Sequence, residues 1–163
     1  MIDMTDRNVV ITGGANGGQG LAETLMLAAA GAAVVAADLA AEPSTAMKAA
    51  AAEYPDRITY HQLDVTQADD WTALAGFLQS ASVRLDGLVN NAGITRRSRL
   101  LEVTPPADLA AVSDVNVAGA LLGMQACVPL MKSGGSIVNV GSVAALTGHY
   151  PVAYTASKWL CVG

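Results

Sequence analysis

The sequence predicts an α/β fold, a doubly wound parallel sheet covered by helices on both faces. Short, continuous apolar runs alternate with longer segments that suit helices. The runs have the length of strands and show no apolar–polar alternation, which is typical of parallel strands buried on both faces. Polar residues end several runs, where ligands bind in such sheets. Right-handed crossovers then favour the strand order 3-2-1-4-5.

The first half of the chain contains three predicted strand–helix pairs. We expect strands at 8–12, 32–37 and 58–63 and helices at 18–30, 43–53 and 67–82. Gly31 is suited to end the first helix, and Pro43 to open the second. Asp38 and Asp64 directly follow the second and third strands.

The second half continues the same alternation. We expect a strand at 85–89, a long helix from 106 to about 132, a turn at Gly134-Gly135 and a strand at 136–140. The last helix is expected to start at Tyr154. Residues 115–131 are an uncharged run, but they include Asn116 and Pro129, which favours a buried or interface helix over a membrane span.

Composition narrows the class of protein. The 163 residues suit one domain, 52% are hydrophobic and only 14% are charged. The net charge of −5 and the absence of a basic run argue against nucleic acid as a partner. The polar N-terminus does not resemble a signal peptide, and two cysteines do not make a disulfide framework. We therefore expect a cytoplasmic protein without a membrane partner, and no metal site is predicted because no ligand spacing is present.

A glycine-rich turn, TGGANGGQG at 12–20, follows the first strand. Glycines let the backbone approach a pyrophosphate, and the next helix offers amide donors at its N-terminus. The GxxxGxG spacing is formed by Gly14, Gly18 and Gly20. The turn is one residue too long when read from Gly13, and this residue is either absorbed as a bulge or widens the site. A plain turn is the alternative interpretation.

Asp38 indicates which dinucleotide the turn would hold. It lies 18 residues after Gly20, where a carboxylate can accept a hydrogen bond from a ribose 2′-hydroxyl. A 2′-phosphate needs a nearby Arg or Lys, but Asn16 and Leu39 occupy the neighbouring positions. NAD is therefore predicted in preference to NADP. The alternative for Asp38 is a solvated charge at a strand end.

Tyr154 and Lys158 are the most chemically informative pair. Four residues apart, they lie on one face of a helix, one turn from each other. A cation beside a phenol favours the phenolate, so Tyr154 is a candidate proton donor or acceptor for a carbinol or carbonyl oxygen. Taken alone, the pair also fits an ordinary exposed helix face.

With these motifs in order, the chain from 8 to 163 resembles the classical short-chain dehydrogenase/reductase family. The resemblance is carried by Thr12-Gly13 with the glycine-rich turn, Asp64-Val65, Asn90-Asn91-Ala92-Gly93, Asn116, Ser142 and Tyr154-x-x-x-Lys158. It implies a Rossmann-like fold over 1–163 and hydride transfer between NAD(P) and a small alcohol or ketone.

The resemblance also implies a cofactor site. The turn would hold the pyrophosphate and adenosine ribose through Thr12, Gly13, Gly14, Asn16, Gly18 and Gly20. Asp64 and Val65 would contact the adenine, while Asn91 and Gly93 would line the cofactor cleft. A helix cap is the alternative role for Asp64.

The catalytic group implied by the resemblance has four members. Tyr154 would be the acid/base and also a cofactor contact, and Lys158 would bind the nicotinamide ribose and favour the phenolate. Ser142 would hold the substrate oxygen, and Asn116 would kink the long helix and hold a relay water. A simple loop serine and an ordinary interhelical hydrogen bond are the alternatives for these last two residues.

Members of the family continue beyond the Tyr/Lys helix with further strands, a substrate-covering segment and oligomer contacts. The resemblance thus predicts a homo-oligomer and leaves an alternative, a silent fragment that binds nucleotide weakly or acts as an interaction module. A 3-oxoacyl-thioester reductase is the alternative within the family, although its usual NADPH disagrees with Asp38. The apolar fifth strand is expected to be an exposed sheet edge that invites self-association.

Overall fold

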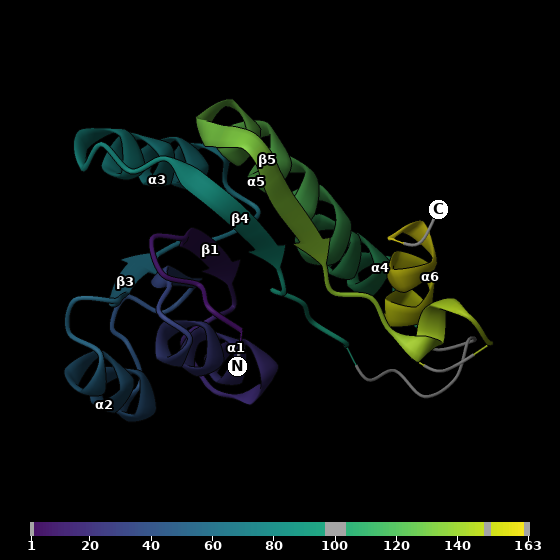
Figure 1. The fold of residues 1–163 in the computed structure, drawn as a ribbon. Coiled ribbons are helices and arrows are strands. Elements are labelled where there is room, and N and C mark those ends of the chain that lie inside the picture. Colours follow the sequence, from purple (N-terminus) through teal and green to yellow (C-terminus); the bar gives the residue numbers. More distant parts are fainter. Residues whose placement is uncertain (1, 97–103, 149–150, 162–163) are drawn as a thin grey trace.

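Five parallel strands form the central sheet (Figure 1), in a computed structural model that describes residues 2–96, 104–148 and 151–161. Their order is β3-β2-β1-β4-β5. The strands are β1 (Asn8–Thr12), β2 (Ala33–Asp38), β3 (Ile58–Gln62), β4 (Leu85–Asn90) and β5 (Met131–Asn139). The predicted fold class and strand order are confirmed.

Helices cover both faces of this sheet. On one face lie α1 (Gly18–Ala29) and α2 (Thr45–Glu53), and on the other lie α3 (Ala68–Ser80) and α5 (Gly119–Cys127). Alternation along β1 shows the division, because Val10 packs with the α3 and α5 residues while Val9 and Ile11 pack in a cluster with Leu27 of α1. The runs are continuously apolar because each strand is buried on both sides.

The long helix predicted for 106–132 is interrupted and ends earlier. It consists of α4 (Pro106–Ser113), a π-helical turn η2 (Asp114–Ala118), α5 and a 3₁₀ turn η3 (Val128–Leu130). Pro129 lies within the 3₁₀ turn, and proline lacks the amide donor that an α-helix needs. The stretch is thus helical from Pro106 to Leu130 and ends about two residues before the expected Lys132, and Asn116, where a kink was expected, lies in the π-helical turn.

Other element boundaries also differ from those predicted. The α2 helix begins at Thr45 because the Ser44 hydroxyl, not Pro43, caps it by accepting from the Met47 amide at 3.1 Å. The expected turn at Gly134-Gly135 lies within β5, whose register against β4 shifts between Leu85 and Gly87. The last helix, α6 (Val152–Leu160), starts two residues before Tyr154.

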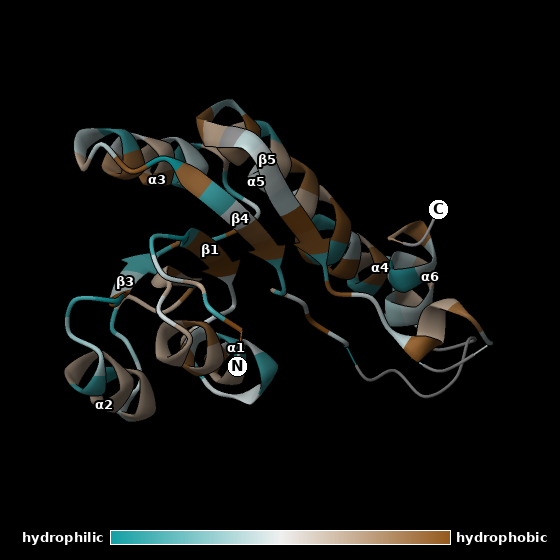
Figure 2. Ribbon diagram, in the orientation of Figure 1, coloured by the Kyte–Doolittle hydropathy of each residue, from teal (hydrophilic) through white to brown (hydrophobic). Residues whose placement is uncertain are grey.

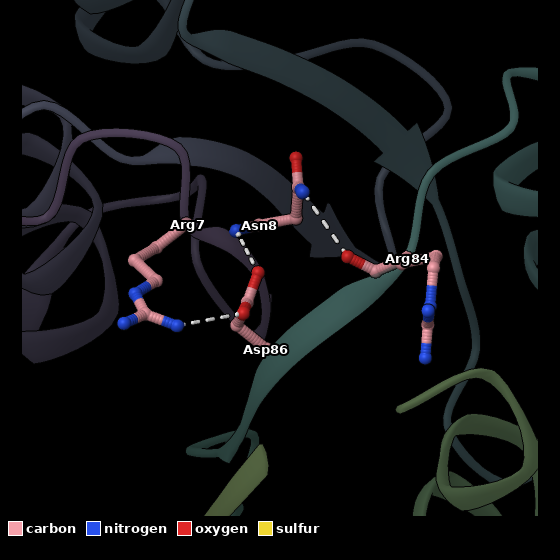
Figure 3. A network of polar contacts seen from close by, with 4 residues as sticks. All are labelled: Arg7, Asn8, Arg84 and Asp86. Carbon is pink, nitrogen blue, oxygen red and sulfur yellow. Dashed lines mark hydrogen bonds and ion pairs between the residues drawn. The ribbon is translucent and has the colours of Figure 1, made fainter. Parts of the chain in front are cut away.

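Polar contacts join β1 to β4 at the end of the sheet opposite the glycine-rich turn (Figure 3). Asp86 is paired with Arg7 at 3.0 Å and accepts from the Asn8 amide at 3.0 Å. The Asn8 side chain donates to the Arg84 carbonyl at 3.1 Å. These bonds fix the register of the two central strands, whose opposite ends carry the candidate site.

One helical stretch among the described residues, Pro106–Leu130, has the length and apolar composition of a membrane span. A single helix of this kind also occurs in soluble proteins. Only 28% of its most apolar window is buried, and Leu109, Leu121 and Val128 are exposed. The hydropathy colouring shows apolar segments on α5 and on the C-terminal half of β5 (Figure 2). The interpretation of residues 115–131 as part of a buried or interface helix stays a prediction.

The edge strand β5 should mediate self-association of this chain. Ile137 and Val138 are 37% and 51% exposed, and an apolar edge strand pairs readily with another chain. We expect the wild-type chain to sediment as an oligomer and Val138→Lys to lower the oligomer fraction. Ile2→Lys adds the same charge at an exposed apolar residue away from the strand and should have no effect. A monomeric wild-type chain in sedimentation velocity would contradict the expectation.

Candidate active site

The residues singled out from the sequence gather at the carboxyl ends of the strands, between the start of α1 and the start of α6. In Figure 1 the arrowheads of β4 and β5 point toward the end of the molecule that carries α4 and α6. Ligands bind at this edge in open parallel sheets.

The glycine-rich turn is built around a close contact. A Cβ on Gly20 would lie 2.1 Å from the Gly13 carbonyl oxygen and 2.5 Å from the Asn91 side-chain nitrogen. Gly13 has a positive φ of 64°, and a Cβ there would lie 3.0 Å from the Ala92 Cα. Only glycine fits at Gly20, and this brings the first turn of α1 directly against the end of β1.

Four contacts hold the first half of the turn. Thr24 donates from its buried hydroxyl to the Gly14 carbonyl at 3.0 Å, and the Gly14 amide donates to Ala37 at 3.2 Å. Ser44 donates to the Ala15 carbonyl at 2.8 Å, and Asn91 reaches the Gly13 carbonyl at 3.2 Å.

The second half of the turn has an unusual backbone conformation. Gly17 and Gly18 have φ values of 100° and 62°, and among the described residues a Cβ on either would meet nothing within 4 Å. Residues other than glycine adopt two consecutive positive φ values only with strain. The N-terminus of α1, which begins at Gly18, has no side-chain cap. Its amides are thus arranged to suit an anionic group such as a pyrophosphate.

Asp38 at the end of β2 faces this turn. One carboxylate oxygen accepts from the amides of Ala15 and Asn16, each at 3.1 Å, and the other accepts from Leu39 at 2.9 Å. A carboxylate has about four acceptor positions, so one remains for a further donor. The Tyr60 hydroxyl donates its one hydrogen to the Ala40 carbonyl and lies 3.3 Å from the Asp38 carbonyl. Burial, then the Asp38 charge, raises the pKa of this phenol.

The end of β1 is tied to the segment after β4. The Thr12 hydroxyl accepts from the amides of Asn91 and Ala92 at 3.1 and 3.0 Å. Asn91 in turn donates to the Thr12 carbonyl at 2.9 Å. Thr12 and Asn91 therefore hold the two central strand ends together, and these contacts give both residues a structural role.

Asp64 and Val65 follow β3 and lead into α3. The Asp64 carboxylate accepts from the Thr66 amide and hydroxyl at 2.9 and 2.8 Å. Val65 is buried, and its carbonyl accepts from the Trp71 indole at 3.0 Å. The capping alternative for Asp64 was wrong, because the N-cap of α3 is Gln67 and the Asp64 carboxylate instead binds Thr66 in the turn before the helix.

Lys158 is a buried cation held at the end of β5. Its ammonium donates to the Val140 carbonyl at 2.7 Å, and the residue is 6% exposed. The nitrogen lies 5.7 Å from the centroid of the Tyr154 ring. An ammonium has three donors, so two remain for groups that enter the site. The expected pairing of Tyr154 with Lys158 on one helix face is present.

Asn116 is the centre of a second set of contacts. It is 4% exposed and lies in the π-helical turn, where the helix predicted from sequence is distorted. Its amide binds both backbone groups of Ile94, accepting at 2.9 Å and donating at 3.1 Å. It also donates to the Ser157 hydroxyl at 2.9 Å. Gly93 makes room for it, since a Cβ there would lie 3.3 Å from the Asn116 oxygen.

Ser142 stands at the start of the 3₁₀ turn η4 (Val143–Ala145), two residues after the Val140 carbonyl that binds Lys158. Its hydroxyl accepts from the Ala144 amide at 3.1 Å. The hydroxyl hydrogen is not used in that bond and is available to a ligand oxygen.

A cavity of about 270 Å³ lies beside Asn116 and Lys158. Polar side chains of Thr12, Asn90, Asn116, Asn139 and Lys158 line it. Asn90 is buried and donates to Asn139 at 2.8 Å, and its own oxygen has no hydrogen-bond partner among the described residues. Sequence reasoning missed Asn139 and Ser157. Ser157 lies inside the Tyr–Lys motif, but its partner Asn116 is 41 positions away.

Comparison with known proteins gives the family of this chain. The family model described as short chain dehydrogenase matches residues 7–163. The chain is 38% identical to trans-4-hydroxycyclohexanecarboxylate dehydrogenase of Sinomonas cyclohexanicum, over 96% of this chain and 63% of that protein. It is also 38% identical to 3-alpha-(or 20-beta)-hydroxysteroid dehydrogenase of Mycobacterium bovis, over 94% of this chain and 58% of that protein.

A solved structure gives the same result for the fold. The short-chain dehydrogenase/reductase of Brucella melitensis superposes with a TM-score of 0.89 at 31% identity, covering 99% of this chain and 68% of that one. The chain belongs to the short-chain dehydrogenase family. It spans about three fifths of the length of the curated relatives it matches.

Proposed function

We propose that this protein is an NAD-dependent oxidoreductase that interconverts a secondary alcohol and a ketone, with Tyr154 as acid/base. The observation that carries the proposal is the fixed pair in α6, where the buried Lys158 ammonium is anchored on Val140 at 2.7 Å and lies 5.7 Å from the Tyr154 ring. A buried cation with spare donors beside a phenol is suited to proton transfer at an oxygen.

The residues at the strand ends fit a nicotinamide dinucleotide. The uncapped start of α1 and the close contact at Gly20 suit a pyrophosphate, and Asp38 keeps one acceptor position for a ribose hydroxyl. Thr12, Gly13, Gly14, Asn16, Gly18, Asp64, Val65, Asn91 and Gly93 would complete this site. When bound, the nicotinamide would supply or accept the hydride at the carbinol carbon.

The protein's own part is to orient the substrate and move one proton. Tyr154 would donate its phenolic proton to the carbonyl oxygen in reduction and remove it from the alcohol in oxidation. Lys158 would hold the ribose with a spare donor and stabilise the phenolate. Ser142 would donate to the same substrate oxygen, and Asn116 would hold a water that returns the proton.

The substrate class follows from the relatives. Both curated relatives described above are named for hydroxyl groups on ring compounds. We therefore infer that ring-bound secondary alcohols are the first substrates to test. To test this substrate class, a panel of substituted cyclohexanols and hydroxysteroids is offered to the protein, and the reduction of NAD is measured by absorbance. Absence of turnover with bound NADH would favour the silent nucleotide-binding alternative.

Asp38 should make the protein prefer NADH to NADPH. A fixed carboxylate repels a 2′-phosphate, and neither Asn16 nor Leu39 supplies a compensating cation. We expect NADH to bind at least about tenfold more tightly than NADPH, which is about 1.4 kcal/mol. Asp38→Ala should reduce the difference in affinity between NADH and NADPH, because the repulsion of the 2′-phosphate is removed. It should also weaken NADH binding, because the turn loses the two hydrogen bonds from the Ala15 and Asn16 amides.

Asp38→Asn serves as the control for this experiment, since it removes the charge and keeps an acceptor oxygen. This variant should bind NADH more tightly than Asp38→Ala does, and the difference in affinity between NADH and NADPH should still be smaller than in the wild-type chain. Fluorescence titration with both cofactors measures each constant. Tighter binding of NADPH by the wild-type chain would refute NAD preference and favour the 3-oxoacyl-thioester reductase alternative.

The remaining parts of the proposal concern the protein as a whole. Residues 1–163 would act as one NAD(P)-binding domain, in a cytoplasmic homo-oligomer whose partner is a small alcohol or ketone. The exposed apolar residues of β5 and of the Pro106–Leu130 stretch support the oligomer. The net charge of −5 argues against nucleic acid as a partner.

A further inference from the structure

Ser157 lies inside the Tyr–Lys helix but faces away from solvent. It is completely buried, whereas its neighbour Ala156 is exposed. Its hydroxyl donates to the Tyr154 carbonyl at 2.7 Å and accepts from the Asn116 amide at 2.9 Å. A serine hydroxyl has one donor hydrogen, so this donor is fully used within the protein.

The Asn116 side chain is oriented by independent contacts. Its oxygen faces the Ile94 amide and its nitrogen faces the Ile94 carbonyl, which leaves the second amide hydrogen for Ser157. Ser157 therefore receives a hydrogen bond from a group whose direction is already fixed. Asn116 exchanges two hydrogen bonds with Ile94, and from Asn116 the donors run through Ser157 to the backbone carbonyl of Tyr154.

Two side chains of the α6 helix anchor it through polar contacts with other segments. Lys158 is held on Val140 at the end of β5, and Ser157 is held on Asn116 in η2. The helix has only nine residues, and a helix this short is marginal without tertiary contacts. Loss of either anchor would let the helix rotate or fray at Tyr154.

We propose that Ser157 is a positioning residue, which couples the π-helical turn at Asn116 to the Tyr154/Lys158 pair and sets where the phenol lies. The inference rests on the proposed function, because the phenol must be placed for proton transfer. Ser157 touches neither substrate nor cofactor in this role and acts only through the helix that carries Tyr154.

Three variants of the full chain test the coupling. Ser157→Ala removes the hydroxyl, and Ser157→Thr keeps it, since a helical threonine can also bond the carbonyl three residues before it. Ala156→Gly is the matched control, because it weakens the same helix at an exposed residue and leaves both Ser157 bonds in place. Urea unfolding checks that each variant is folded.

We expect Ser157→Ala to lower kcat about 10- to 100-fold, the effect of a small misplacement of a reacting group. KM and the NADH dissociation constant should stay within about threefold, since no binding contact is removed. Ser157→Thr should recover most of kcat, and Ala156→Gly should lose little. Unchanged kcat in Ser157→Ala, or an equal loss in Ala156→Gly, would overturn the proposal.

A second readout does not depend on turnover. With 3-fluorotyrosine incorporated, the Tyr154 signal is assigned by its loss in Tyr154→Phe. We expect Ser157→Ala and Asn116→Ala to shift or split this signal in the same way, and the double variant to add little, because both remove one link. Ala156→Gly should leave it unchanged. Absence of turnover in the wild-type chain would refute the proposed function alone. An unchanged Tyr154 fluorine signal in Ser157→Ala would refute the positioning role of Ser157.

Discussion

Tyr154→Phe should lower kcat for any alcohol that the protein oxidises by about 10²–10⁴-fold, the usual contribution of general acid–base catalysis. The substitution removes only the phenolic oxygen and keeps the ring beside Lys158. Because the anchored Lys158 and the residues at the strand ends remain to hold the cofactor, the NADH dissociation constant should change by less than about threefold. Steady-state kinetics and NADH titration on the same preparation measure both.

The control is Tyr54→Phe, which removes a phenolic oxygen at the end of α2, away from the site. It should keep wild-type kcat and NADH binding. Lys158→Ala should differ from both, because it lowers kcat and also weakens NADH through the lost ammonium. Equal turnover in wild type and Tyr154→Phe would remove Tyr154 from the mechanism and leave the nucleotide-binding alternative.

Gly20→Ala should disable both the fold of the turn and NADH binding. The added methyl would lie 2.1 Å from the Gly13 oxygen and 2.9 Å from the Gly13 carbonyl carbon, and these backbone atoms cannot move without separating α1 from β1. Overpacking typically costs about 1–3 kcal/mol and occasionally more, and a backbone clash this short should reach the upper end. NADH binding should fall beyond detection in a fluorescence titration.

Gly76→Ala is the matched control for this glycine. Gly76 is an exposed residue within α3, and a Cβ there would meet nothing within 4 Å. Alanine at this position should stabilise the protein by about 1 kcal/mol through helix propensity and leave NADH binding unchanged. A Gly20→Ala chain that unfolds at the wild-type urea concentration and binds NADH would contradict the contact geometry.

Local pattern in the sequence determined the architecture. Each strand is a continuous apolar run and each helix an intervening segment, so the strand order follows from handedness and connection rules alone. Local pattern also determined that Tyr154 and Lys158 share one face of a helix, because this depends only on helical periodicity. The glycines of the turn were expected to let the backbone approach a pyrophosphate, whereas the contact of Gly20 with Gly13 and Asn91 comes from the structure.

The sequence-based prediction of a helix boundary was wrong where a neighbouring side chain caps the helix. Ser44 displaced Pro43 as the start of α2 because a hydroxyl that accepts from an amide two or three residues on is a strong cap. The resemblance implied a kink at Asn116, but the apolar pattern itself continues through that residue and does not indicate the π-helical turn. Its π-helical turn is associated with bonds to Ile94 and Ser157, which no periodicity encodes.

Only the tertiary structure decided how the candidate site is held together. Asp38 binds the amides of Ala15 and Asn16 across 22 or 23 positions, and Asn116 binds Ser157 across 41. Partners of this kind are chosen when distant segments are brought together and their buried donors must find acceptors. The sequence therefore determined which chemical groups this protein has at the strand ends, and the fold decided which of them touch, because hydrogen bonds depend on distance and direction rather than on spacing along the chain.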